Sequence, residues 1–158
     1  MATRSEKDAC DLLDADHKAV KKLFNAYSDL GASRARTAVK KKIELVRQIC
    51  QELNVHMQIE EEIFYPALRA ALKDTSIVAE GEVEHQGAKD LVAQIESGTE
   101  PDEMFDAKVK VLGENIDHHV KDERTEMFPK ARAARKLDLV AMRDQLQARK
   151  DELMGAMA

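Results

Sequence analysis

A block of one histidine, one glutamate and one proline occurs twice in this chain, as His56, Glu60 and Pro66 and again as His119, Glu123 and Pro129. In both copies the glutamate follows the histidine by four residues. On an α-helix, side chains four residues apart project from the same face, one turn above the other. Imidazole nitrogens and carboxylate oxygens are common ligands of transition metals. The repeated block therefore predicts metal-binding positions.

A second repeat lies upstream of each block. The pattern acid-His-x-x-x-Lys-x-Leu occurs in residues 16–23 and again in residues 84–91. The order along the chain is thus lone histidine, block, lone histidine, block, which is typical of two copies of one helical hairpin. Two hairpins placed face to face would surround a central site with four imidazoles and two carboxylates, those of His17, His56, Glu60, His85, His119 and Glu123.

Composition and spacing predict an all-α protein. Only three prolines and six glycines occur among 158 residues, and the abundant alanine, leucine, lysine and glutamate favour helix. Apolar residues at three- and four-residue steps predict four helices joined by short loops, which we interpret as an up-down-up-down antiparallel four-helix bundle. The predicted helices cover about residues 7–30, 34–72, 77–96 and 102–132.

Local signals mark some of the helix ends. Gly31 is expected to stop the first helix, and Ser33 is expected to cap the second. Pro66 lies inside a helical pattern, where it removes a backbone hydrogen bond. We therefore expect the second helix to bend one turn beyond Glu60.

The repeat ends before the chain does. We predict a four-helix bundle over residues 7–133 and an appended amphipathic helix within residues 134–158. Apolar side chains predict that this helix spans about residues 137–154, and they include Leu139, Met142, Leu146 and Leu153. The helix could dock on its own bundle, form a homodimer or bind a protein partner, and docking is the simplest of these.

The charge pattern excludes some classes of function. Charged residues make up 35% of the chain and the net charge is -5, with acids and bases interspersed. Nucleic-acid binding would need a basic stripe, so we expect no nucleic-acid partner. Residues 1–8 are too polar for a secretory signal and no apolar run approaches a membrane span, so we expect no membrane partner and a cytoplasmic location. Cys10 and Cys50 lack a CxxC spacing and are interpreted as reduced, structural thiols.

The two block glutamates favour a metal over a simple hydrogen-bond network. Glu60 and Glu123 stand in the apolar stripes of their helices, where a carboxylate without positive charge nearby is costly. No arginine lies at that level of the stripes, whereas a metal pair would supply the charge. A buried His/Glu hydrogen-bond network is the alternative. Helix phase selects His119 as the ligand and turns His118 about 100° away, to the surface or behind the ligands.

The ordered set of histidines and glutamates, with Phe64-Tyr65-Pro66 and Phe128-Pro129 just downstream, resembles the hemerythrin-like, HHE cation-binding domain family of the bacterial single-domain type. The resemblance covers about residues 11–133. It implies a four-helix bundle that holds a non-haem di-iron centre with an oxo or hydroxo bridge. Manganese or zinc could also occupy a His/carboxylate site, but four imidazoles favour iron. Carried over by position, the resemblance implies that Glu60 and Glu123 would bridge both irons. His17 and His56 would hold one iron, and His85 and His119 would hold the other.

One departure from the family pattern concerns Lys89. Oxygen-carrying hemerythrins have a further histidine one turn after the position of His85, and here that position is lysine, a poor ligand while it is protonated. This moves our expectation from oxygen transport toward reactivity. Lys89 and its counterpart Lys21 either extend to water or lie behind the ligands near the metals, where His118 is a third candidate.

Six protein ligands cannot saturate two octahedral ions, so water, oxygen, peroxide or nitric oxide would have places to bind. We therefore expect a di-iron protein that binds or reacts with small oxygen or nitrogen species, and catalase-like peroxide disproportionation is the enzymatic version of this hypothesis. Oxygen binding or sensing without turnover and iron storage or buffering are the alternatives.

Overall fold

The computed structural model describes residues 6–157. Residues 1–5, which belong to the segment interpreted as too polar for a secretory signal, and Ala158 of the predicted C-terminal segment lie outside the described residues. Within residues 6–157 all regular structure is helical and no strand occurs. The prediction of an all-α protein is confirmed. No helix in this range combines the length and the apolar character needed to cross a membrane.

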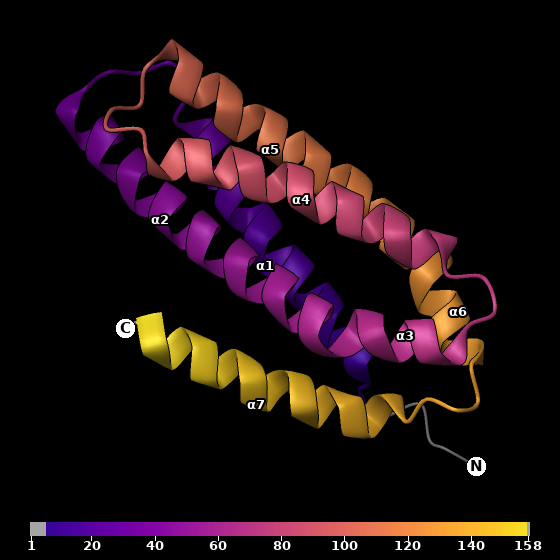
Figure 1. Ribbon diagram of the computed structural model, residues 1–158. Helices are drawn as coiled ribbons and strands as arrows, with labels where there is room; N and C mark the ends of the chain where they lie inside the picture. The colour runs from indigo at the N-terminus through magenta and orange to yellow at the C-terminus, as the bar shows by residue number, and fades with distance from the viewer. Residues whose placement is uncertain (1–5, 158) are drawn as a thin grey trace.

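Four long helices run alternately in opposite directions and form the bundle, and a further helix lies along its side (Figure 1). Their bounds agree with the predicted helices to within three residues. In chain order the bundle comprises α1 (Ala9–Asp29); α2 (Arg36–Ile59), η1 (Glu60–Phe64) and α3 (Tyr65–Ala71); α4 (Ser76–Glu96); and α5 (Glu103–Asp122), η2 (Glu123–Met127) and α6 (Phe128–Ala133); the further helix is α7 (Leu139–Met157).

The helix ends follow from local chemistry, with one correction. Helix α1 begins with a capping box in which Asp8 and Asp11 each accept the backbone N–H of the other at 3.0 Å. Gly31 has a φ of +59°, which an L side chain rarely adopts, and it ends the helix as predicted. Ser33 does not cap α2, because that helix begins two residues later than expected and its N-cap is Ala35. The Ser33 hydroxyl instead accepts the Ala35 N–H within the turn.

A widened helical turn begins at the glutamate of each block and precedes the proline of that block, Pro66 or Pro129. The N–H of Tyr65 donates to the carbonyl of Glu60, five residues earlier, and the N–H of Phe128 donates to the carbonyl of Glu123 in the same way. Proline has no N–H, and its ring would collide with the carbonyl four residues before it, so a π-helical turn relieves both problems. The helix is therefore widened from Glu60 onward, and the bend expected one turn beyond Glu60 stays a prediction.

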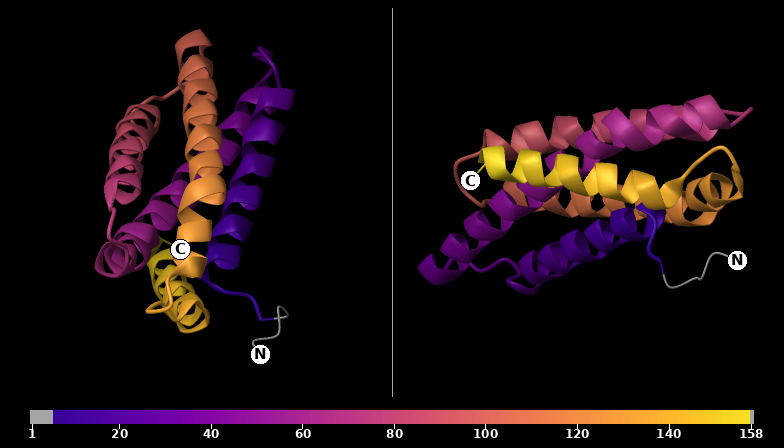
Figure 2. Two further views of the ribbon diagram at one scale, coloured as in Figure 1. Left: turned by 90° about the vertical axis from the view of Figure 1, so that its right-hand side faces the viewer. Right: turned by 90° about the horizontal axis from the view of Figure 1, so that it is seen from below.

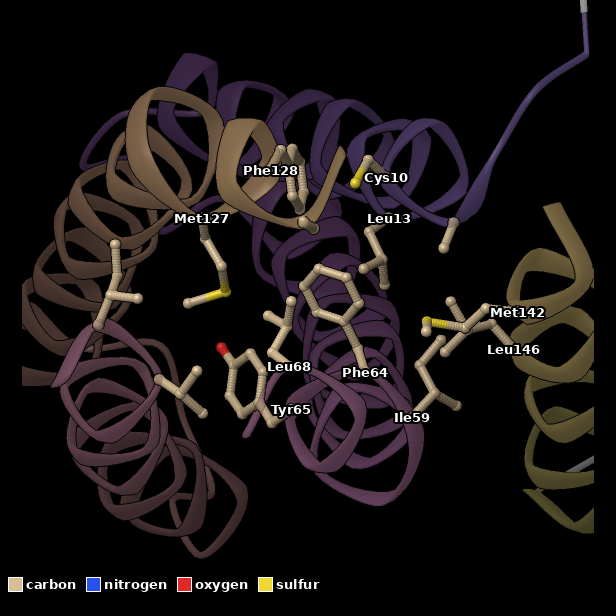
Figure 3. Close-up of a cluster of buried hydrophobic side chains, with 14 of the residues drawn as sticks. Cys10, Leu13, Ile59, Phe64, Tyr65, Leu68, Met127, Phe128, Met142 and Leu146 are labelled. Atoms are coloured by element: carbon tan, nitrogen blue, oxygen red, sulfur yellow. The ribbon is translucent and has the colours of Figure 1, made fainter. Parts of the chain in front are cut away.

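Two apolar clusters fill the bundle and leave a polar level between them. One cluster lies toward the α3 and α6 end, where Phe64 and Phe128 meet at its centre (Figure 3). The other is built by residues such as Phe24, Leu53 and Leu112 nearer the α4–α5 loop. On each helix the predicted ligand residues fall between members of the two clusters in sequence, so apolar packing on both sides fixes their height in the bundle.

Helix α7 docks on its own bundle, against α1, α2 and η1, as two further views show (Figure 2). Met142 and Leu146 are its buried apolar residues and point toward Ile59 (Figure 3). Two cations add polar contacts, because Arg149 donates to Glu62 at 2.7 Å and Lys150 donates to Asp16 at 2.6 Å. A homodimer or a partner complex through this helix stays a prediction.

Leu146→Ala is expected to lower the free energy of unfolding by about 2–5 kcal/mol, because it leaves a cavity at a fully buried position. Leu153→Ala, at a partly buried position of the same helix, is the matched control and is expected to cost less. Urea unfolding followed by circular dichroism measures both. Equal, small losses would show that α7 contributes little to the fold.

Candidate metal centre

The six predicted ligand residues meet at one level in the middle of the bundle. They come from α1, from the α2–η1 and α5–η2 junctions and from α4, so all four long helices contribute. Each is at most 6% exposed, and both glutamates are completely buried. The structure therefore brings together all six residues that the two repeats single out, which are His17, His56, Glu60, His85, His119 and Glu123.

Each glutamate lies between imidazoles of the two hairpins. One carboxylate oxygen of each reaches two Nε2 atoms: Glu60 reaches those of His56 and His85 at 3.1 and 3.2 Å, and Glu123 reaches those of His119 and His17 at 2.7 and 3.5 Å. Within residues 6–157, the central residues form two groups, and the ligand atoms inside each group all lie within 4.8 Å of one another. One group is Glu60, His85, His119 and Glu123, and the other is His17, His56 and Glu123. The geometry suits two cations that share a carboxylate.

The centre is rich in polar atoms that lack a hydrogen-bond partner. Among the described residues, six buried side-chain atoms have none, namely both oxygens of Glu60, both oxygens of Glu123, and the Nε2 atoms of His17 and His56. Several of these atoms are within ion-pair distance of one another but are not aligned for hydrogen bonds. Buried polar groups are nearly always satisfied in native proteins. Lone pairs that converge without donors are what a bound cation would satisfy, so these residues fit a metal.

Each of the four predicted ligand imidazoles lies beside a carboxylate on the side away from the centre. The Nδ1 atom of each ring lies within hydrogen-bonding distance of one carboxylate oxygen: His17 of Asp14 at 3.2 Å, His56 of Asp16 at 3.0 Å, His85 of Glu61 at 2.8 Å and His119 of Glu84 at 2.7 Å. In a neutral imidazole, a carboxylate in this position favours the tautomer with hydrogen on Nδ1, so that the Nε2 lone pair faces the centre and can bind a metal. The sequence repeat does not show these pairings. Asp16 and Glu84 each precede a ligand histidine in sequence, but they pair with His56 and His119, which lie on other helices.

Outer cations hold most of these carboxylates in turn. Arg124 donates to Asp14, Lys150 to Asp16 and Lys89 to Glu61. The Lys89 ammonium thus reaches the centre only through Glu61 and His85. Lys150 belongs to α7, so the C-terminal helix contacts the site through a single carboxylate.

The other two candidates for a place behind the ligands lie farther out. Lys21 pairs with Asp117 at 2.7 Å, and both side chains are about half exposed. The His118 side chain is 68% exposed and lies 3.5 Å from Glu84 and 3.3 Å from Asp122. His118 therefore touches the outer carboxylate of His119, whereas Lys21 stands at the surface.

Charge and burial act against each other on the central imidazoles. Burial alone would lower the pKa of His56, but the charge of Glu60 and the hydrogen bond to Asp16 outweigh it and raise the pKa well above its usual range. Burial would likewise lower the pKa of His119, but the nearby carboxylates of Glu123 and Glu84 outweigh it and raise this pKa to about 10. For Glu60, burial is outweighed by the charge of His56, and the pKa falls well below its usual range. In the metal-free protein, protons on His56 and His119 thus balance the carboxylates, and a metal would have to displace these protons.

Tyr65 is a site residue that the ligand pattern did not identify. Its hydroxyl lies 3.2 Å from Nε2 of His85 and 3.3 Å from Nε2 of His119, and its ring stacks on His85 with centroids 5.1 Å apart. Burial and the charges of Glu60 and Glu123 raise the pKa of this phenol, so it holds its proton. One signal could have found it, because the equivalent residue of the second block is phenylalanine, which breaks the repeat.

Gly81 makes the space that Tyr65 occupies. A Cβ at Gly81 would lie 2.9 Å from the Tyr65 hydroxyl oxygen, whereas a Cβ at Gly87 of the same helix would meet nothing within 4 Å. Gly81→Ala is expected to destabilise the fold by about 1–3 kcal/mol through this collision. The control Gly87→Ala should stabilise it by about 0.5–1 kcal/mol through helix propensity. Urea unfolding distinguishes the two, and equal stabilisation would show that Tyr65 is not confined there.

The two cysteines are free and lie within the apolar clusters. Burial raises the pKa of the Cys10 thiol and of the Cys50 thiol to about 12. A reactive thiol requires a lowered pKa. Both residues are therefore packing elements of the core, in line with their interpretation as structural thiols.

Comparisons with known proteins identify the family. The hemerythrin HHE cation binding domain model matches residues 8–131, which is most of the chain. A crystal structure of a hemerythrin HHE cation binding domain-containing protein from Mycobacterium kansasii has the same fold, with a TM-score of 0.78 and 22% identity over 95% of this chain and 89% of that chain. No curated protein sequence matches significantly. The chain therefore belongs to the hemerythrin HHE cation-binding domain family.

Proposed function

We propose that the chain binds two iron ions at the central site and reacts there with small oxygen or nitrogen species. The family is a cation-binding one, and the His/Glu groups of the site can hold metal. The observation that carries the proposal is the set of six buried nitrogen and oxygen atoms that have no hydrogen-bond partner and converge between the two hairpins. Hydrogen bonding within the protein leaves these lone pairs unused, so a plain polar network explains the site less well than metal does.

We assign the ligands by hairpin and by distance. The imidazoles of His17 and His56 would hold one iron, and those of His85 and His119 would hold the other. The carboxylates of Glu60 and Glu123 would bridge both. The positions of the glutamate oxygens between imidazoles of both pairs support this assignment. Imidazole-rich sets with carboxylates favour iron over manganese, and zinc is the other alternative.

The residues around the ligands define what the site can do. Bound iron would supply one-electron redox chemistry toward oxygen or peroxide. The outer carboxylates orient the imidazoles, and the complete burial of both glutamates keeps bulk water away from the charges. The Tyr65 hydroxyl, beside His85 and His119, can donate a hydrogen bond to a small molecule there. The arrangement supports peroxide disproportionation as the enzymatic form of the proposal.

The environment of Lys89 supports reactivity over reversible oxygen transport. Its side chain is 40% exposed and its Nζ atom donates to Glu61, which lies behind His85, so Lys89 is placed as an outer partner of a ligand and not as a fifth nitrogen ligand. One coordination position that the oxygen carriers fill with histidine would thus be left to water or substrate.

Metal analysis of protein purified without added metal tests the proposal. We expect about two irons per chain, oxo-bridge charge-transfer bands in the optical spectrum, and oxygen release when peroxide is added. A folded protein without metal would contradict the di-iron centre. Two irons without peroxide turnover would instead favour oxygen binding or sensing. The cytoplasmic location stays a prediction from the sequence.

A further inference from the structure

A surface groove between α1 and α5 lies against the central site. It encloses about 760 Å³, and its walls include His17, Ile116 and Val120. The same three side chains line the small central cavity of about 10 Å³, into which His56, His85 and His119 also face. They therefore form the wall between the groove and the proposed metal centre, and one of them is a proposed ligand.

The rim of this groove is strongly basic. Five cations line it, Lys18, Lys21, Lys22, Lys121 and Arg124, against a single acid, Asp117. Lys21 is paired with Asp117, while Lys18 and Arg124 share Asp14. Across residues 6–157 no carboxylate oxygen lies within 4.0 Å of the ammonium of Lys22 or Lys121. This excess of positive charge occurs on a chain whose net charge is -5.

The groove on the opposite side of the centre is balanced in charge. It encloses about 730 Å³ between α3 and α4, and Tyr65 lies in its wall. Its cations are paired with its acids, Arg69 with Glu82 at 2.9 Å and Lys89 with Glu61. Basic character is thus particular to the α1–α5 groove and is not a general property of the surface around the site.

We propose that the α1–α5 groove is the entrance by which small inorganic anions reach the metal centre. The inference rests on the proposed function, because the anions would be ligands of the proposed iron centre, in addition to the neutral species with which that centre reacts. A concave basic surface raises the local concentration of anions and accelerates their association. Lys22 and Lys121 carry this effect, since no carboxylate neutralises them directly, and displacement of the Ile116 or Val120 side chain would open the wall. A neutral ligand gains nothing from the charge.

Azide, a small monoanion, tests the inference on the iron-loaded protein. The double variant K22A/K121A is compared with K40A/K41A, which removes the same charge from exposed positions at the start of α2. Iron content and the optical spectrum are measured first in each protein. Stopped-flow absorbance then gives the association rate constant for azide at several salt concentrations.

We expect K22A/K121A to slow azide association by about three- to tenfold at low ionic strength, and the difference to vanish at high salt. The rate constants for azide with K40A/K41A and for neutral nitric oxide with either variant should stay at the unmodified values. An unchanged azide rate in K22A/K121A, an equal loss in K40A/K41A, or an equal loss for nitric oxide would overturn the inference while the di-iron proposal stands. Absence of iron from the unmodified protein would remove the proposed function and this inference with it.

Discussion

Glu123→Gln is expected to reduce bound iron from about two ions per chain to one or fewer. The Glu123 carboxylate belongs to both groups of ligand atoms and reaches imidazoles of both hairpins. Glutamine has nearly the same volume, but its amide is neutral and a weaker ligand, so both ions would lose a bridging charge. Metal analysis after purification without added metal measures the loss, and the optical spectrum should lose its oxo-bridge bands.

The fold is expected to survive this substitution, so the loss of iron will report on coordination. Glutamine keeps the shape of the side chain, and its amide has a smaller desolvation cost than a carboxylate. Circular dichroism should therefore show unchanged helicity. Glu126→Gln, an exposed position in the same segment η2, makes the same chemical change and should retain about two irons. Full iron content and an unchanged spectrum in Glu123→Gln would contradict the assignment of Glu123 as a bridge.

The doubled pattern made the fold and the central level of the site predictable. Apolar spacing locates each long helix because burial of one face is a local property of the sequence. The two blocks then place His56 above Glu60 and His119 above Glu123 by helical geometry alone. Antiparallel packing of two hairpins brings these pairs to one height, so no long-range information was needed.

The supporting contacts were not predictable, because they depend on how the helices rotate against one another. Asp16 precedes His17 in sequence but pairs with His56, 40 residues away, and its cation is Lys150, 134 residues away. Tyr65 lies in the resemblance motif, yet its place at the centre follows from the widened turn that begins at Glu60. A single extra residue in a helical turn shifts every later side chain around the axis, and helix periodicity does not show it.

The metal-free protein is expected to lose stability as the pH rises from about 6.5 toward 10. The folded pKa of His119 is about 10, above the ordinary value of 6.5. A group whose pKa is raised on folding contributes stability below the unfolded pKa, and that contribution is lost as the pH climbs to the folded pKa. His56 and His85 are shifted in the same direction. Glu60, whose pKa is lowered, contributes above its ordinary value of 4.5 and loses this as the pH falls. Stability should therefore be greatest between about pH 4.5 and 6.5.

Bound iron should remove this alkaline loss, because the metal takes the place of the protons between the imidazoles and the carboxylates. A ligand present at about 1,000 times its dissociation constant stabilises a fold by about 4 kcal/mol, which raises the melting temperature of a chain of this size by about 8–16 °C. Thermal unfolding of metal-free and iron-loaded protein at pH 6 and pH 9 measures both effects. The gap between the two forms should widen at the higher pH, since fewer protons then compete with the metal.

A pair of adjacent histidines provides the control for this pH dependence. His119→Gln removes a buried imidazole at the centre and should reduce the loss of stability of the metal-free protein between pH 6 and pH 9. His118→Gln changes the exposed neighbour and should leave that loss as it is in the unmodified protein. If both variants keep the full loss, the alkaline destabilisation does not arise at the centre. If the iron-loaded protein declines as steeply as the metal-free one, the metal does not replace the protons on these imidazoles.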